Sequence, residues 1–262
     1  MQVFLGIDSG SVSTKAACCD SQGNLLAFSY LPTNGQSLQK AREALQTIKK
    51  DLPSLTKIES VCITGSARKL VATALKADFI KNEISAQAMA AAKLMPNAAT
   101  VLEIGGQDSK IILMENGLPV DFAMNTVCAA GTGSFLDHQA ARLGINIEDF
   151  AVLAAKSQKN VSIDARCTVF AESAMISAQQ SGVAKEDIAQ GLAQSLANNF
   201  LNNVCAGKTL KGPYIFQGGV ARNQAIVLAL QKNLNEKITV PPYPHISGAY
   251  GAALCALKES QK

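Results

Sequence analysis

The sequence predicts a mixed α/β protein built from two similar lobes. Three observations lead to this prediction: strand-like and helix-like apolar patterns alternate along the chain, one acid–glycine–lysine pattern occurs twice, and glycine-rich turns follow three apolar strands. With 262 residues the chain is long enough for two lobes of ordinary size, whose core needs no disulfide.

The first half begins with strands and continues with helices. Short apolar runs separated by Gly, Ser and Asn turns predict a β-meander, and apolar residues at every third or fourth position predict a helix from Ser37 to Lys50. Short helices should fill the chain up to about Lys93. The predicted strands are Val3–Ile7, Lys15–Cys19, Leu25–Tyr30 and Ile58–Thr64.

The second half repeats the meander and then becomes helical. Asn116-Gly117 predicts a hairpin turn, and Gly144 and Gly182 lie where helices should end. The predicted strands are Thr100–Ile104, Lys110–Met114, Val120–Met124, Tyr214–Phe216 and Ile238–Val240. The predicted helices are Ser134–Leu143, Thr168–Gln180, Glu186–Val204, Asn223–Leu234 and Gly248–Leu257.

The repeated pattern indicates an internal duplication. An acid, a glycine and a lysine recur at one common offset, each set within a hairpin-like segment. The matched residues are Asp8 with Glu103, Gly10 with Gly105, and Lys15 with Lys110. We therefore divide the chain into a first lobe, residues 1–97, and a second lobe, residues 98–262.

Composition excludes several classes of protein. Charged residues make up 17% of the chain, which is too little for a disordered or coiled-coil protein. The net charge of +4 comes without a basic run, and no apolar stretch reaches the ~20 residues of a membrane span. Because the start also lacks the basic region of a signal peptide, we expect a cytoplasmic protein that binds neither nucleic acid nor membrane.

Glycine-rich turns after apolar strands are suited to phosphate, since backbone N–H groups approach an anion closely there. The turns are 8–11, 105–107 and 218–219, and Ser11, Ser13 and Thr14 add hydroxyl donors. Two duplicated turns facing each other across a cleft could hold a polyphosphate, with Asp8 and Glu103 as carboxylates for Mg²⁺ and for ordering water. Each turn alone could equally be a plain hairpin with a solvated acid.

These turns carry motifs that resemble those of the actin/Hsp70/sugar-kinase ATPase superfamily. Gly6–Ser11, Leu102–Gly106 and Phe216–Ala221 resemble its first phosphate, second phosphate and adenosine motifs. The resemblance implies two ribonuclease-H-like (actin-like ATPase) lobes with a nucleotide cleft between them, which binds ATP or ADP with Mg²⁺. It also suggests that a terminal helix, from about residue 247, packs back on the first lobe.

The nucleotide-binding positions that this resemblance implies lie in the same motifs. Lys15 could hold phosphate, or it could be a strand lysine on a solvated face. His245 stands where the family commonly has a glutamine, so an adenine contact from this position departs from the family pattern. The remaining positions are Gly10, Ser11, Val12, Ser13, Thr14, Gly105, Gly106, Gln107, Asp108, Gly218, Gly219 and Val220.

Three further segments, 104–110, 125–133 and 166–173, resemble the activator ATPases of 2-hydroxyacyl-CoA dehydratases, a family that includes ATPase subunits of benzoyl-CoA reductase. The resemblance implies a homodimer that shares one 4Fe–4S cluster, with two cysteine ligands per subunit that carry over to Cys128 and Cys167. It implies that ATP-driven movement delivers a low-potential electron to a dehydratase or related reductase. Ferredoxin or flavodoxin would be the electron donor.

The cysteine pattern supports this resemblance less specifically. Seven cysteines without a Cys-x-x-Cys spacing disfavour a disulfide framework or a zinc site, and most should be small buried hydrophobes. A 4Fe–4S cluster takes four thiolates, which two identical chains can supply as two each. Cys128 and Cys167 both precede predicted helices, whose free N–H groups favour a thiolate, although each could also be an ordinary buried residue.

The sequence thus predicts an ATP-hydrolysing iron–sulfur electron-transfer activator. A small-molecule kinase of the same superfamily is the alternative, but it would need a substrate pocket and would leave Cys128 and Cys167 unexplained. A nucleotide-dependent structural or chaperone protein would normally carry a further interaction domain, for which this length leaves little room.

Overall fold

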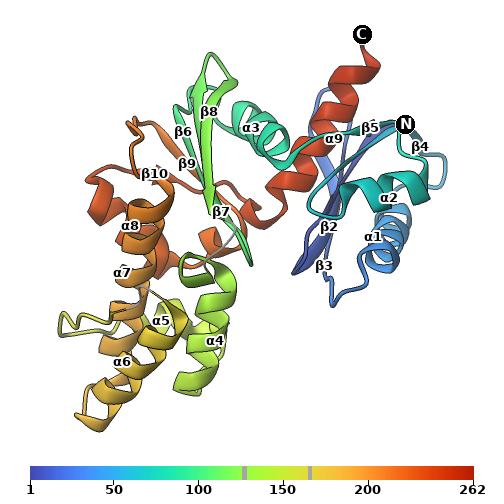
Figure 1. Cartoon of the computed structure of the whole chain (residues 1–262). Coiled ribbons are helices and arrows are strands. Elements are labelled where there is room, and N and C mark those ends of the chain that lie inside the picture. The colour runs from blue at the N-terminus through green and yellow to red at the C-terminus, as the bar shows by residue number, and fades with distance from the viewer. Residues whose placement is uncertain (126–128, 165–166) are drawn as a thin grey trace.

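The computed structural model describes residues 1–125, 129–164 and 167–262. Its strands form two five-stranded sheets (Figure 1). The first sheet contains β1 (Gln2–Ser9), β2 (Ser13–Cys19), β3 (Leu25–Pro32), β4 (Lys57–Thr64) and β5 (Phe79–Ile80), in the order β3-β2-β1-β4-β5. The second contains β6 (Thr100–Ile104), β7 (Ser109–Glu115), β8 (Leu118–Asn125), β9 (Tyr214–Gln217) and β10 (Ile238–Thr239), in the order β10-β9-β6-β7-β8. The predicted α/β fold class is confirmed.

The helices cover both sheets. The first half holds α1 (Ser37–Asp51), α2 (Arg68–Leu75) and α3 (Glu83–Leu94). The second half holds α4 (Gly133–Leu143), α5 (Phe150–Ala154), α6 (Thr168–Gln180), α7 (Lys185–Val204), α8 (Gln224–Leu234) and α9 (Ser247–Ser260). No helix of the described ranges is long and apolar enough to cross a membrane.

The two sheets share one strand pattern. β1 pairs antiparallel with β2 and parallel with β4, and β6 pairs in the same way with β7 and β9. Within these pairs Asp8 lies opposite Lys15, and Glu103 lies opposite Lys110. Residues directly opposite each other on antiparallel strands are close neighbours on one face. The repeated sequence spacing therefore produces the same acid–amine pair in each sheet.

The first sheet is buried on both faces because alternate residues of β1 face different layers. Val3, Leu5 and Ile7 share an apolar core with residues of α1 and α2. Phe4 belongs instead to a core built with α9. Figure 1 shows α9, the last helix of the chain, against the strands of this first sheet.

Two helices form the layer between the sheets. The helix α9 packs on β1, β2 and β4, while α3 contributes to an apolar core with the second sheet, and the two helices pack against each other. Glycines allow α9 to approach β1 and α3 closely. A Cβ on Gly6 of β1 would overlap the carbonyl oxygen of Ala249 in α9, and a Cβ on Gly251 of α9 would overlap the carbonyl oxygen of Ala86 in α3. Backbone therefore lies against backbone along this layer.

We expect Gly251→Ala to destabilise the protein by about 1–3 kcal/mol, because the Ala86 carbonyl cannot yield without separating α3 from α9. This cost should exceed the helix propensity that alanine adds. Urea unfolding measures the change. Gly219→Ala is the control, since no atom lies within 4 Å of its added Cβ; equal stability of both variants would contradict the close packing described for α9.

The other face of the second sheet carries the largest core. Four phenylalanines that are at most 1% exposed fill it, together with residues of α4, α5, α7 and α8: Phe135, Phe150, Phe200 and Phe216. The predicted elements of this half are present, with small shifts at their ends; for example, β10 ends at Thr239 and α9 continues to Ser260. The short elements β5 and α5 were not predicted, because two and five residues are too few to show an apolar period.

Candidate functional site

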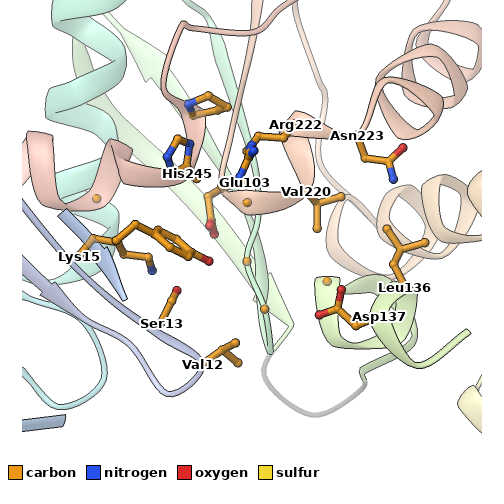
Figure 2. Close-up of a pocket in the computed structure, with 18 of the residues that line it drawn as sticks. Val12, Ser13, Lys15, Glu103, Leu136, Asp137, Val220, Arg222, Asn223 and His245 are labelled. Atoms are coloured by element: carbon orange, nitrogen blue, oxygen red, sulfur yellow. The ribbon is translucent and has the colours of Figure 1, made fainter. Parts of the chain in front are cut away.

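A cleft lies where the duplicated glycine-rich turns meet. It consists of two neighbouring cavities of about 350 and 260 Å³, which share Asp8, Lys15, Glu103 and Gln87 among their lining residues. Figure 2 shows Val12, Ser13 and Lys15 on one side of it. Leu136, Asp137 and Val220 stand on the other side, so both halves of the chain contribute walls.

The structure brings most of the predicted nucleotide-binding residues to this cleft. The two cavities together are lined by Asp8, Gly10, Ser11, Val12, Ser13, Lys15, Glu103, Gly105, Gly106, Gln107, Asp108, Gly218, Gly219, Val220 and His245. Thr14 is the exception, because it lines neither cavity. Its side chain is fully buried and its hydroxyl lies 2.9 Å from that of Thr33, because alternation along β2 turns it away from Ser13 and Lys15.

Two glycines lie close to the carboxylate of the first acid–amine pair. Lys15 Nζ lies 3.1 Å from Asp8 Oδ2. A Cβ on Gly65 would lie 2.6 Å from Asp8 Oδ1, and one on Gly248 would lie 2.7 Å from Asp8 Oδ2. Burial alone would lower the pKa of Lys15, but the charge of Asp8 and its hydrogen bond to the amine, together with the charges of Tyr30 and Glu103, raise the pKa overall. The amine is therefore charged, and it is available to a phosphate beside Asp8.

The second pair belongs to a larger buried network. Lys110, which is 2% exposed, has Nζ within 2.9 Å of Glu103, 3.0 Å of Glu83 and 3.0 Å of Asp108. Burial alone would lower the pKa of Lys110, and the three carboxylates raise it instead. Burial raises the pKa of Glu103 to about 7. The charges of Asp108 and Glu83 add to the rise, and the charge of Lys110 opposes it. Glu103 thus changes charge near neutral pH, where a general base works best.

Several residues of the cleft were missed by the sequence analysis, among them two on α3. Glu83 and Gln87 lie on α3 and line the smaller cavity, and Gln87 lines both. The side-chain amide N–H of Gln217 donates a hydrogen bond of 2.7 Å to Gln87 Oε1. The only available signal was the spacing of four residues between Glu83 and Gln87, which places both on one helix face.

The second phosphate turn is tied to α4. Gly133 and Ser134, at the start of this helix, donate backbone hydrogen bonds of 2.8 Å to the carbonyls of Gly105 and Gly106. Across the cleft, a Cβ on Gly106 would lie 2.7 Å from the Val12 side chain. The turn therefore contacts Val12, from the first half of the chain, on one side and α4 on the other.

The larger cavity suits a flat ring and a sugar. Leu136, Ile147 and Val220 give it apolar walls, and Asp137 and Glu148 give it an acidic edge that can accept hydrogen bonds from hydroxyl groups. Burial raises the pKa of Asp137, with Glu148 adding to the shift.

His245 closes the cavity near Tyr30. Its ring meets the Tyr30 ring edge-on, with centroids 5.4 Å apart. Burial lowers the pKa of His245, and the nearby charges of Arg222 and Lys15 lower it further, so its ring is neutral at neutral pH. A neutral imidazole offers one donor and one acceptor to a bound base.

The cleft also fits a hydrated magnesium ion. The described residues contain no group of three or more His, Cys, Asp or Glu side chains arranged for a metal. Mg²⁺, however, is commonly held by one or two carboxylates together with phosphate oxygens and water. Asp8 offers such a carboxylate, and the buried Thr64 hydroxyl in the same cavity has no hydrogen-bond partner within the described ranges.

The cysteines differ in accessibility. Cys128 lies outside the described residues. Cys167 is half-buried and immediately precedes α6. The other five are buried, as the sequence predicts: Cys18, Cys19, Cys62, Cys205 and Cys255. Burial raises the pKa of each of these five thiols, to about 12 for Cys19, Cys62 and Cys205, so they are held as neutral thiols. Among the described cysteines, Cys167 is thus the one placed to act as a thiolate ligand.

Comparison with known proteins agrees with this geometry. Residues 5–256 match the model of the BadF/BadG/BcrA/BcrD ATPase family. The (R)-2-hydroxyglutaryl-CoA dehydratase activating ATPase of Acidaminococcus fermentans is 37% identical, over 98% of both chains.

Two solved structures resemble the whole chain. One is component A of (R)-2-hydroxyglutaryl-CoA dehydratase from Acidaminococcus fermentans, with a TM-score of 0.93, 35% identity and full coverage of both chains. The other is the activator of 2-hydroxyisocaproyl-CoA dehydratase from Clostridium difficile with bound ADPNP, with a TM-score of 0.90 and 32% identity, covering 99% of this chain and 96% of that one. The second of these two proteins was solved with the nucleotide ADPNP bound.

Proposed function

Because this chain belongs to the BadF/BadG/BcrA/BcrD ATPase family, we propose that it is an ATP-hydrolysing activator that passes a low-potential electron to a 2-hydroxyacyl-CoA dehydratase or a related CoA-ester reductase. Relatives named as dehydratase activators support this function. The observation that carries it is the position of Cys167: an accessible thiol at a helix start, in the half of the chain that supplies the second phosphate turn.

ATP would lie with its phosphates between the two glycine-rich turns and its nucleoside in the larger cavity. Lys15 offers a charged amine to the phosphates, and Asp8 offers a carboxylate to Mg²⁺, which would neutralise the charge that develops during hydrolysis. Glu103 is proposed to order the attacking water and to take its proton, since its pKa lies near the pH at which it must act.

A second copy of the chain would complete the redox site. Cys128 and Cys167 of each copy are the proposed ligands of one 4Fe–4S cluster, which when bound stores a single transferable electron. Val169 and Phe170, in the first turn of α6 after Cys167, are 71% and 58% exposed, and Ile176 on the same helix is 41% exposed. Large apolar side chains so exposed favour a covered position, so α6 is a suitable dimer surface.

The proposed coupling follows from differential binding. A nucleotide can change the arrangement of the lobes only by binding one arrangement more tightly than another. The close backbone contacts of α9 with β1 and α3 support a pivot in the layer between the sheets. Closing the cleft around ATP would then turn the second lobe, together with α6. Ferredoxin or flavodoxin is the proposed electron donor.

Cys167→Ser should abolish the broad absorbance near ~400 nm of thiolate-bound iron. Each subunit then loses one of its two proposed ligands, so two of the four thiolates of the shared cluster are missing. Anaerobic reconstitution, an absorbance spectrum, an iron count and a molecular mass in solution test this. Cys205→Ser is the matched control, since Cys205 lies at the end of α7 in the same half of the chain and is buried.

Three outcomes would contradict the proposal or part of it. Wild-type protein that stays colourless, iron-free and monomeric after reconstitution would remove the redox function. ATP-dependent phosphorylation of a sugar or carboxylate by that iron-free protein would favour a small-molecule kinase instead. Absorbance retained in Cys167→Ser and lost in Cys205→Ser would reassign the ligands.

A further inference from the structure

The helix α4 contacts both the nucleotide cleft and the cysteine-bearing helix α6. We propose that Glu172 on α6 is a positioning residue: through its ion pair with Arg142 and its hydrogen bond with His138, both on α4, it transmits nucleotide-dependent movement of α4 to α6 and so to Cys167. This inference rests on the proposed function, because it concerns how occupation of the cleft affects the redox site.

One side of α4 faces the nucleotide. Its first two residues, Gly133 and Ser134, donate hydrogen bonds of 2.8 Å to the carbonyls of the second phosphate turn. One turn later, Leu136 and Asp137 line the larger cavity (Figure 2). Any shift of the phosphate turn or of a bound nucleoside therefore acts on α4 at two successive turns.

Another side of α4 holds α6. His138 and Arg142 are spaced by four residues and so lie on one helix face. His138 Nε2 is 3.3 Å from Glu172 Oε2, and Arg142 Nη2 is 2.5 Å from Glu172 Oε1. Both carboxylate oxygens of Glu172 thus contact side chains of α4. Glu172 lies little more than one helical turn after Cys167, so a shift of its carboxylate displaces the start of α6.

Apart from these contacts with α4, few side chains of α6 are buried. Ala171 and Met175 are its buried residues, and they pack into the core that includes α7. Most of the other side chains of α6 are exposed, including Val169 and Phe170. Ala174 and Ala178, which are half-buried, also pack against this core. A helix held by three alanines and one flexible methionine can tilt, and the contacts of Glu172 then decide which tilt accompanies the position of α4.

The expected effect is moderate. The side chains of Arg142 and His138 are 53% and 47% exposed, and exposed ion pairs contribute little to stability. Loss of these pairs should therefore leave the fold intact and reduce the response of α6 to nucleotide by about two- to five-fold. High salt should weaken the response of the wild-type protein in the same direction.

Hydrogen exchange followed by mass spectrometry tests the inference with or without iron. ADPNP is added to the full chain, and exchange is compared at α4 and at α6. In the wild-type protein we expect ADPNP to slow exchange at both helices. In Glu172→Gln the response of α4 and the affinity for ADPNP should persist, while the response of α6 falls. Asp121→Asn is the matched control, since Asp121 forms a 2.6 Å pair with Lys208 on the surface of the same half.

A charge-reversed pair of substitutions distinguishes loss of the coupling between α4 and α6 from a non-specific structural effect of the substitution. Glu172→Arg alone should lose the response of α6, and Glu172→Arg combined with Arg142→Glu should regain part of it. A full response in Glu172→Gln, or an α6 that does not respond in the wild-type protein, overturns the inference. Failure of the proposed function is a separate result: wild-type protein without iron in which α6 still responds to ADPNP retains the coupling and loses only the redox role.

Discussion

Glu103→Gln should lower the rate of ATP hydrolysis by about 10²–10⁴-fold, the usual contribution of a general base. The amide keeps the size of the side chain but cannot take a proton from water. Lys110 keeps Asp108 and Glu83 as partners at 3.0 Å each, so the network loses one charge rather than its amine. Binding of ADPNP should therefore change little, and steady-state hydrolysis should show the loss in kcat.

The pH dependence gives this prediction a second test. Burial raises the pKa of Glu103 to about 7, so the wild-type rate should rise with pH up to about 7 and then level off. Glu103→Gln should lose that rise. Because a raised pKa makes the charged form unfavourable in the folded protein, stability due to Glu103 is present at low pH and lost as pH rises through about 7. The variant should thus be no less stable than wild type at alkaline pH.

Glu148→Gln is the control for position. Glu148 lines the same larger cavity but lies at the end where we propose that the nucleoside binds, so its loss should raise KM rather than lower kcat. Wild-type kcat in Glu103→Gln, with its dependence on pH unchanged, would remove Glu103 from the chemistry and leave it as a partner of Lys110.

The sequence was most informative where local spacing has a direct geometric meaning. The recurrence of an acid seven residues before a lysine places both across a hairpin, and the structure forms that pair twice. Glycine-rich turns at strand ends likewise meet at one cleft, because both halves have the same strand order around β1 and β6. Such features follow from the strand period and turn chemistry alone.

Other features depend on contacts between distant segments. Glu83 joins Lys110 only because α3 crosses to the second sheet, and no spacing within 83–94 shows this. Thr14 was placed in the cleft with its neighbours in a loop motif, but β2 begins at Ser13 and its alternation turns Thr14 inward. The pairing of Arg142 with Glu172 was hidden for the same reason, since the two residues lie on separate helices.

Lys110→Met should destabilise the protein by about 3–5 kcal/mol, the usual cost of leaving buried charges without their partner. The amine is 2% exposed and is shared by Glu83, Glu103 and Asp108. Methionine matches the length of the aliphatic part, so little cavity is created. Urea unfolding at about pH 8 should show the loss, since the carboxylates are then ionised.

The loss should shrink as the pH falls, and this direction identifies its cause. Without Lys110 the carboxylates repel one another in a buried site, so their pKa values should rise and protonation at about pH 5 should remove most of the repulsion. Lys208→Met removes an amine from an ion pair with Asp121, where the carboxylate is 47% exposed, and should cost less than about 1 kcal/mol at either pH. A loss in Lys110→Met that is equal at both pH values would point to packing instead of charge. A loss confined to alkaline pH would show that one buried amine holds the acids of α3 and the second phosphate turn together.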